Sequence, residues 1–240
     1  MRPHVRLLHT SDLHLHWSHA RTSLDSIRGL RVAAESTQAQ SVLMAGDIFD
    51  TADQPAEFVA EVASEINAFE VPIVLIPGNH DIRYSEQERD ALGSLGAALR
   101  PGHSLLHSIE GASTTLLGGA LHVWGRGMAE HSPKNDPLAG LAVSEDPNTW
   151  SVVLAHGELM SKAGGLRSSP IILDRHAEAL AGVHYVALGH HDDAKVSRWG
   201  STVVCYSGSV SPILGTGDYA VVDLLDPHGV EVRIERLALE

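Results

Sequence analysis

Five short apolar runs in this sequence are each followed within a few residues by aspartate, asparagine or histidine, and this repeated pairing constrains the fold more than any other feature. Each run has the length of a β-strand. In open α/β sheets, polar groups that follow different strands meet beyond the carboxyl ends of those strands, where ligands bind. We therefore expect the five clusters to converge at one edge. They are Asp12-Leu-His14, Gly46-Asp-Ile-Phe-Asp50, Gly78-Asn-His-Asp81, Ala155-His-Gly157 and Gly189-His-His-Asp192.

The N-terminal third alternates between strand-like and helix-like patterns. Its strands are apolar throughout, which is typical of a parallel sheet covered by helices. Ser23 is the expected N-cap of the first helix, because a serine side chain accepts hydrogen bonds from the free N–H groups at a helix start. The expected strands are Val5–His9, Val42–Ala45 and Pro72–Ile76, and the expected helices are Leu24–Thr37 and Pro55–Phe69.

The rest of the chain predicts more strands and few helices. Apolar stretches broken by glycine over His103–Trp124 predict two or three antiparallel strands. Prolines and acidic residues over Gly125–Thr149 predict a loop and a candidate lid, and one helix is expected at Asp174–Ala181. No linker divides the chain, so one domain over 1–240 is expected. The other expected strands, hairpin-like at the C-terminal end, are Ser151–Ala155, His184–Leu188, Ala194–Trp199, Thr202–Tyr206, Tyr219–Leu225 and Val230–Leu237.

Composition bears on the cellular compartment. No apolar run approaches the roughly 20 residues that a membrane-spanning helix needs, and the first residues lack the apolar core of a secretory signal. Cys205 is the only cysteine, so neither an intrachain disulfide nor a thiolate zinc cluster can form. These features predict a cytoplasmic protein with no membrane association.

The formal net charge of -13 repels nucleic acid as a whole-molecule field. This charge argues against a protein that simply coats DNA. It does not exclude a nuclease, because bound divalent ions and a local basic rim can outweigh a distant acidic surface.

The residue types of the five clusters predict a metal site. Asp12, Asp47 and Asp192 would lie close together at the sheet edge, and two carboxylates 4 Å apart repel by about 4 kcal/mol at an effective dielectric near 20. Cations must balance them. Mixed oxygen and nitrogen donors suit two hard or borderline divalent ions. A glycine precedes a proposed ligand at positions 46, 78 and 189, where a positive φ or close packing is expected.

The five motifs and their order resemble those of calcineurin-like metallophosphoesterases. The segments Leu8–His14, Ala45–Thr51 and Val74–Asp81, with Tyr206–Ser209, are most similar to the nuclease subunit of SbcCD-type DNA repair complexes. The resemblance implies an α/β fold, a four-layer α/β/β/α sandwich that forms one domain without a separate capping domain.

The resemblance also implies a ligand set for two divalent ions, manganese before iron or zinc. Asp47 would bridge the two ions. The remaining ligands would be Asp12 and His14 on the first ion, and Asn79, His156 and His190 on the second.

The last motif departs from the family pattern, which has Gly-His-any-His. This chain has Gly189-His190-His191-Asp192, so Asp192 stands where a histidine would bind the first ion. A carboxylate there would favour manganese over zinc. His191 is the alternative ligand. Asp192 ranks above it because neighbouring residues at a strand end point in opposite directions.

The family pattern leaves His80 free of metal, to donate a proton or hold the phosphate, with Asp81 orienting its ring. Asp50 is expected to tie down its own loop. The implied substrate is a phosphodiester, DNA before others, and the implied partner is an SbcC-like ATPase. The alternatives are a small-molecule phosphodiesterase or phosphomonoesterase, and a binding scaffold without catalysis.

The other histidines have no motif support. His9 and His131, like the rest of them, are interpreted as structural or surface residues. Arg126, Lys162 and Arg167 lie in loops from which they could reach a phosphate, although solvated charge is the simpler interpretation.

Overall fold

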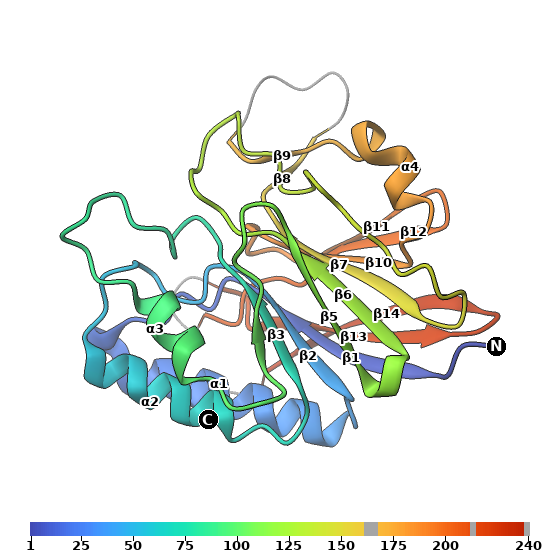
Figure 1. Cartoon of the computed structure of the whole chain (residues 1–240). Coiled ribbons are helices and arrows are strands. Elements are labelled where there is room, and N and C mark those ends of the chain that lie inside the picture. The colour runs from blue at the N-terminus through green and yellow to red at the C-terminus, as the bar shows by residue number, and fades with distance from the viewer. Residues whose placement is uncertain (161–167, 212–214, 238–240) are drawn as a thin grey trace.

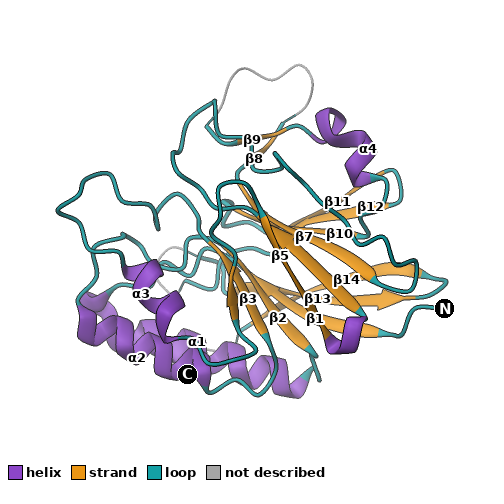
Figure 2. Ribbon diagram, in the orientation of Figure 1, coloured by secondary structure: helices purple, strands orange, loops and turns teal. Residues whose placement is uncertain are grey.

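The computed structural model describes residues 1–160, 168–211 and 215–237. Two six-stranded sheets pack face to face, and helices cover the outer face of the first (Figure 1). Colouring by secondary structure shows that the other outer face is covered mostly by loops (Figure 2). Among the described helices, none combines the length and apolarity needed to cross a bilayer.

The first sheet has the order β14-β13-β1-β2-β3-β4. Strands β1 to β4 run parallel to one another, as the apolar runs of the N-terminal third predict. Strand β13 pairs antiparallel with β1, and β14 forms a hairpin with β13. The bounds are β1 Val5–Thr10, β2 Ser41–Ala45, β3 Ile73–Ile76, β4 Ser104–Leu105, β13 Asp218–Leu225 and β14 Gly229–Arg236.

The second sheet has the order β11-β12-β10-β7-β6-β5. Strands β12, β10, β7 and β6 are parallel, while the two edge strands are antiparallel to their neighbours. The bounds are β5 Ala112–Leu116, β6 Leu121–Gly125, β7 Trp150–His156, β10 Tyr185–Gly189, β11 Lys195–Trp199 and β12 Thr202–Tyr206. Two short strands, β8 Glu158–Leu159 and β9 Pro170–Ile171, form a separate pair.

Three apolar cores separate the layers. One lies between the first sheet and helices α1 Ala20–Ser36, α2 Ala56–Asn67 and α3 Ala91–Ala98. The second fills the space between the sheets. The third lies on the outer face of the second sheet, where Leu138 and Leu173 pack with the short helix α4 Ala177–Leu180. The α/β sandwich expected from the sequence is confirmed, although its fourth layer is mainly loop.

Several local predictions were wrong. Helix α1 begins at Ala20, and Ser23 lies inside it, where its hydroxyl bonds to the backbone of His16 instead of capping the helix. Helix α3 was missed because two glycines dilute its pattern, and the Asp90 side chain caps it through Gly93 N. The expected helix at Asp174–Ala181 is α-helical only over α4, after a 3₁₀ turn. The loop predicted over Gly125–Thr149 is confirmed from residue 126 onward, because Gly125 is the last residue of β6.

Candidate metal centre

The carboxyl ends of five strands from both sheets meet at one edge. Strands β1, β2 and β3 lead into the clusters around Asp12, Asp47 and Asn79. Strand β7 ends at His156, and His190 directly follows β10 in the facing sheet. The two sheets therefore share one site, and each contributes side chains that lie far apart in the sequence.

Six of the seven predicted ligands gather around Asp47. Ligand atoms of Asp12, His14 and Asp47 all lie within 4.8 Å of one another, and so do those of Asp47, His156 and His190. These two groups share Asp47, the residue predicted to bridge two ions. The ligand atoms of His14, Asp50 and His80 lie equally close to one another, in a third group without Asp47. Asn79 joins the second group, because its Oδ1 lies 3.1 Å from His156 Nε2 and 3.0 Å from His190 Nδ1.

Strong charge interactions act inside this site. Burial raises the pKa of Asp12, and Asp47 raises it further, against the opposing effect of His156. Burial also raises the pKa of Asp47, but His156 and the backbone N–H of His80 outweigh it and leave that pKa well below its usual value. The carboxylate of Asp47 therefore stays ionised.

The two histidines of the second group differ in charge. Burial lowers the pKa of His156, yet Asp47, whose Oδ2 lies 3.3 Å from Nε2, raises it to about 9. His156 Nδ1 also donates to the carbonyl of Ala45 at 2.8 Å. Burial and the neighbouring His156 lower the pKa of His190 to about 3. A proton on His156 thus occupies the position where a cation would balance Asp47.

The donor set fits divalent ions. Buried carboxylates and imidazoles converge without a thiolate, a mixture that suits manganese, iron or zinc. Within the described part of the chain, His14 Nδ1 is buried and forms no hydrogen bond, although the Asp50 carboxylate lies 3.3 Å from it. A buried nitrogen without a hydrogen bond is costly unless something else binds there. The residues gathered here therefore fit divalent metal ions.

Backbone strain is concentrated at the same place. Asp12, His14, Asp47 and His190 all have positive φ, of 52°, 46°, 50° and 102°. Such conformations cost free energy in non-glycine residues and persist only where the surrounding structure imposes them. They aim these side chains at one point.

The three predicted glycines make room for the ligands. Gly46 has a φ of +90°, and a Cβ there would overlap His156. A Cβ at Gly78 would overlap the Asp47 side chain, and one at Gly189 would overlap the carbonyl of Ala45. Close packing, and at Gly46 also the backbone conformation, requires glycine at these positions.

His80 is held differently from the sequence prediction. Its Nδ1 donates to the carbonyl of Asp50 at 2.8 Å, and its ring packs edge-on against His14 with centroids 4.7 Å apart. Asp81 does not orient this ring. Its buried carboxylate accepts hydrogen bonds from three backbone N–H groups instead, those of Ile48, Phe49 and Gly78. Asp81 therefore links the segments that follow β2 and β3. The backbone carbonyl of Asp50 is the group that orients the His80 ring.

Asp192 is the predicted ligand that the structure does not bring to the site. Its side chain is exposed and belongs to neither group. The chain turns outward after His190, and the carbonyl of Asp192 accepts a hydrogen bond from Ser209 N. His191, the alternative, pairs with Glu158 at 3.1 Å and packs on Tyr206.

One residue near the centre had no sequence signal. His131 comes from the loop after β6, and its ring lies 5.3 Å from that of His190. Arg126 on the same loop donates to Asn135 Oδ1 and to the carbonyl of Asp136, so it stabilises the loop itself. Lys162 and Arg167 lie outside the described residues.

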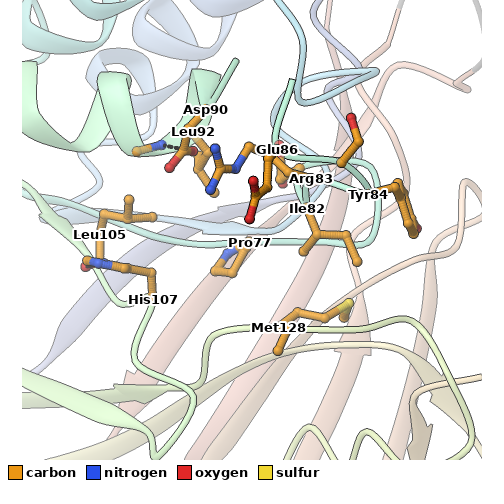
Figure 3. Close-up of a pocket in the computed structure, with 14 residues that line it drawn as sticks. Pro77, Ile82, Arg83, Tyr84, Glu86, Asp90, Leu92, Leu105, His107 and Met128 are labelled. Carbon is orange, nitrogen blue, oxygen red and sulfur yellow. Dashed lines mark hydrogen bonds between the residues drawn. The ribbon is translucent and has the colours of Figure 1, made fainter. Parts of the chain in front are cut away.

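Two cavities flank the centre. One, of about 400 Å³, is lined by Asn79, His80 and three acidic residues, Asp50, Asp53 and Glu88. The other, of about 440 Å³, lies between the segment 82–86 and the side chain of Met128 (Figure 3). Tyr84 lines both cavities and is 71% exposed.

Comparison with known proteins agrees with this geometry. The family model described as calcineurin-like phosphoesterase matches residues 5–193. This match covers all five motifs and both groups of candidate ligands.

Curated relatives match over shorter stretches. The DNA double-strand break repair protein Mre11 of Methanosarcina acetivorans is 28% identical over 107 residues, which are 41% of this chain and 17% of that protein. One subunit of the nuclease SbcCD of Bacillus subtilis is 34% identical over 86 residues, which are 32% of this chain and 22% of that protein. The matches thus span less than a quarter of the length of these relatives.

Solved structures share the fold at low identity. An archaeal phosphodiesterase superposes with a TM-score of 0.53 at 14% identity, covering 97% of this chain and 100% of that chain. A putative 5'-nucleotidase from Staphylococcus aureus gives a TM-score of 0.58 at 11% identity, covering 98% of this chain and 54% of that chain. At these identities the likeness concerns the fold alone.

Proposed function

The chain belongs to the calcineurin-like phosphoesterase family of metal-dependent phosphoric ester hydrolases, and from that premise we propose that it cleaves phosphodiester bonds, those of DNA first. The observation that carries this proposal is the pair of ligand groups that share Asp47. Such a pair is the arrangement that an in-line displacement at phosphorus uses.

The proposed ligands divide around Asp47. Asp12 and His14 would hold one ion, and Asn79, His156 and His190 would hold the other. The two ions, manganese first because oxygen donors are prominent in the set, would polarise the phosphoryl group and lower the pKa of the attacking water. His156 must lose a proton before it can bind an ion, so loading releases a proton.

His80 would donate the proton to the leaving oxygen. Its Nδ1 is engaged by the carbonyl of Asp50, so Nε2 is the nitrogen available to substrate. Because Nδ1 keeps its hydrogen, Nε2 can give up a proton only when the ring is an imidazolium. The ring is exposed beside the cavity that includes Asn79, where a leaving group can lie.

The variant His80→Asn tests this role. Asparagine can keep the hydrogen bond to the carbonyl of Asp50 but has no group in place of Nε2. We expect turnover of bis-p-nitrophenyl phosphate with manganese to fall by about 100- to 10,000-fold, with metal content unchanged by elemental analysis. Loss of metal in this variant would assign His80 to the ligand set instead.

The preference for DNA is supported by sequence similarity to a DNA break repair protein and to a nuclease subunit. The same similarity leads us to propose an SbcC-like ATPase partner and a cytoplasmic location. Purification of the chain with such an ATPase present, followed by size-exclusion chromatography, tests the partnership. Separate elution of the two proteins would contradict it.

A second candidate, a small-molecule phosphodiesterase, is favoured by charge. Three acidic residues line the cavity beside His80, and the chain carries a net charge of -13. A polyanion is repelled by such a rim, whereas a small diester is repelled less. Turnover of single-stranded DNA, bis-p-nitrophenyl phosphate and p-nitrophenyl phosphate should be compared. Cleavage of the small diester without DNA would favour the second candidate, and no turnover at all would favour a scaffold.

A further inference from the structure

His131 faces the centre from the loop that joins β6 to β7. Its ring is tilted by 54° against that of His190. The centroids of the two rings lie 5.3 Å apart. None of the proposed steps above uses His131.

A buried set of hydrogen bonds holds the ring. Arg126 donates to Asn135 Oδ1 at 3.0 Å, which fixes the orientation of the Asn135 amide because guanidinium can only donate. The amide nitrogen of Asn135 then donates to Ser169 Oγ at 2.9 Å. Asn135 is 7% exposed and Ser169 is fully buried.

The single hydroxyl hydrogen of Ser169 must point elsewhere. Its Oγ lies 3.1 Å from His131 Nδ1 and 3.9 Å from Met128 Sδ. An imidazole nitrogen is a much better acceptor than a thioether. Ser169 thus donates to Nδ1, which places the hydrogen of the neutral His131 ring on Nε2. The hydrogen bond that holds this ring among the described residues uses Nδ1 and leaves Nε2 to other partners.

We propose that His131 is a catalytic residue whose Nε2–H donates a hydrogen bond to a phosphoryl oxygen of the substrate, and that Ser169 and Asn135 are positioning residues that fix its tautomer. The proposal deepens the phosphoesterase function proposed above and depends on it. A donor held in place before the reaction stabilises charge that develops on the phosphoryl group without having to reorganise.

The tautomer can be measured directly. Nitrogen NMR of the ¹⁵N-histidine-labelled, zinc-loaded protein, with His131 assigned through His131→Gln, should show Nδ1 without a proton and Nε2 with one. Ser169→Ala should give a mixture of the two tautomers. A protonated Nδ1 in the wild type would overturn the proposal.

Binding of inorganic phosphate to the zinc-loaded protein tests the contact without turnover. His131→Ala should weaken it by about 10- to 100-fold, the range for a hydrogen bond to a charged group, with unchanged zinc content. His131→Gln should recover part of the loss, because its amide can donate.

His176→Ala is the matched control. Its Nε2 lies 3.0 Å from Asp136, so it holds the same loop, and it belongs to neither ligand group. Phosphate affinity should stay within about twofold of the wild type. Equal losses in both alanine variants, an unchanged affinity in His131→Ala or a loss of zinc there would each overturn the proposal. Wild-type protein that binds phosphate through His131 but hydrolyses nothing would overturn the proposed function alone.

Discussion

Two buried histidines differ in charge. The one between the sheets is neutral, and the one at their shared edge is protonated. His9 lies in the interior, where its Nδ1 is 2.7 Å from the hydroxyl of Tyr185, and burial lowers its pKa to about 3. His156 is equally buried, but Asp47 raises its pKa to about 9. Burial alone therefore leaves a histidine neutral, whereas a buried carboxylate beside it reverses the outcome.

The comparison shows why the edge, and not the interior, suits metal ions. Between the sheets, the neutral hydroxyl of Tyr185 bonds to Nδ1 of His9, while Nε2 has no hydrogen-bond partner among the described residues. No carboxylate is among these partners, so no charge needs to be balanced. At the edge, Asp12 and Asp47 are both 2% exposed, and cations must compensate for them. A proton on His156 offsets part of this charge, and divalent ions would do so when bound.

Removing the carboxylate that distinguishes the two regions should have the largest effect. Asp47→Asn takes away the shared ligand and the main partner of His156. We expect activity to fall by about a thousandfold or more, because several kcal/mol of charge stabilisation are lost. Elemental analysis should show fewer than two bound ions.

Asp223→Asn is a matched control for this variant. Asp223 is also a buried aspartate, at 3% exposure, but it pairs with Arg6, His4 and Arg233 on the first sheet. This variant should bind the same number of ions as the wild type. Full activity in Asp47→Asn would rule out the site proposed.

The interior histidine should control acid stability. The folded-state pKa of His9 lies below that of the unfolded chain, so the unfolded state binds a proton first as the pH falls. The stabilisation is complete above pH 6.5 and is lost as the pH falls toward 3, by up to about 1.4 kcal/mol per pH unit. When the pH falls from 6.5 to 5, the free energy of unfolding measured with urea should therefore decrease by about 2 kcal/mol less in His9→Gln than in the wild type. Parallel losses would show that His9 is protonated in the folded chain.

Prediction from the sequence succeeded where a regular period fixes the backbone path. The apolar runs that became β1, β2 and β3 have little choice but to pair in parallel under α1 and α2, and their ends then bring Asp12, Asp47 and Asn79 together. The parallel sheet brings the candidate ligands close together, so the motifs were enough to predict that they share one site.

Prediction failed where loops decide the geometry. No periodicity describes residues 126–149, so nothing in the sequence could show that His131 packs against His190. The orientation of Asp192 depends on a backbone bond to Ser209, which lies beyond the neighbouring hairpin. Helix α3 was missed for another reason, because Gly93 and Gly96 weaken its helical pattern while a side-chain cap and tertiary packing restore it.

The smallest effect should come from Asp192→Asn. The sequence motif predicts a metal ligand at this position, whereas the structure places the side chain outside the site. Asp192 is exposed and lies outside both ligand groups, and its contact to Ser209 uses the backbone carbonyl, which the substitution keeps. Metal content and turnover should stay within about twofold of the wild type, as for an exposed charge. A large drop in manganese content would mean that the loop turns inward when ions bind, so that the carboxylate completes the first group.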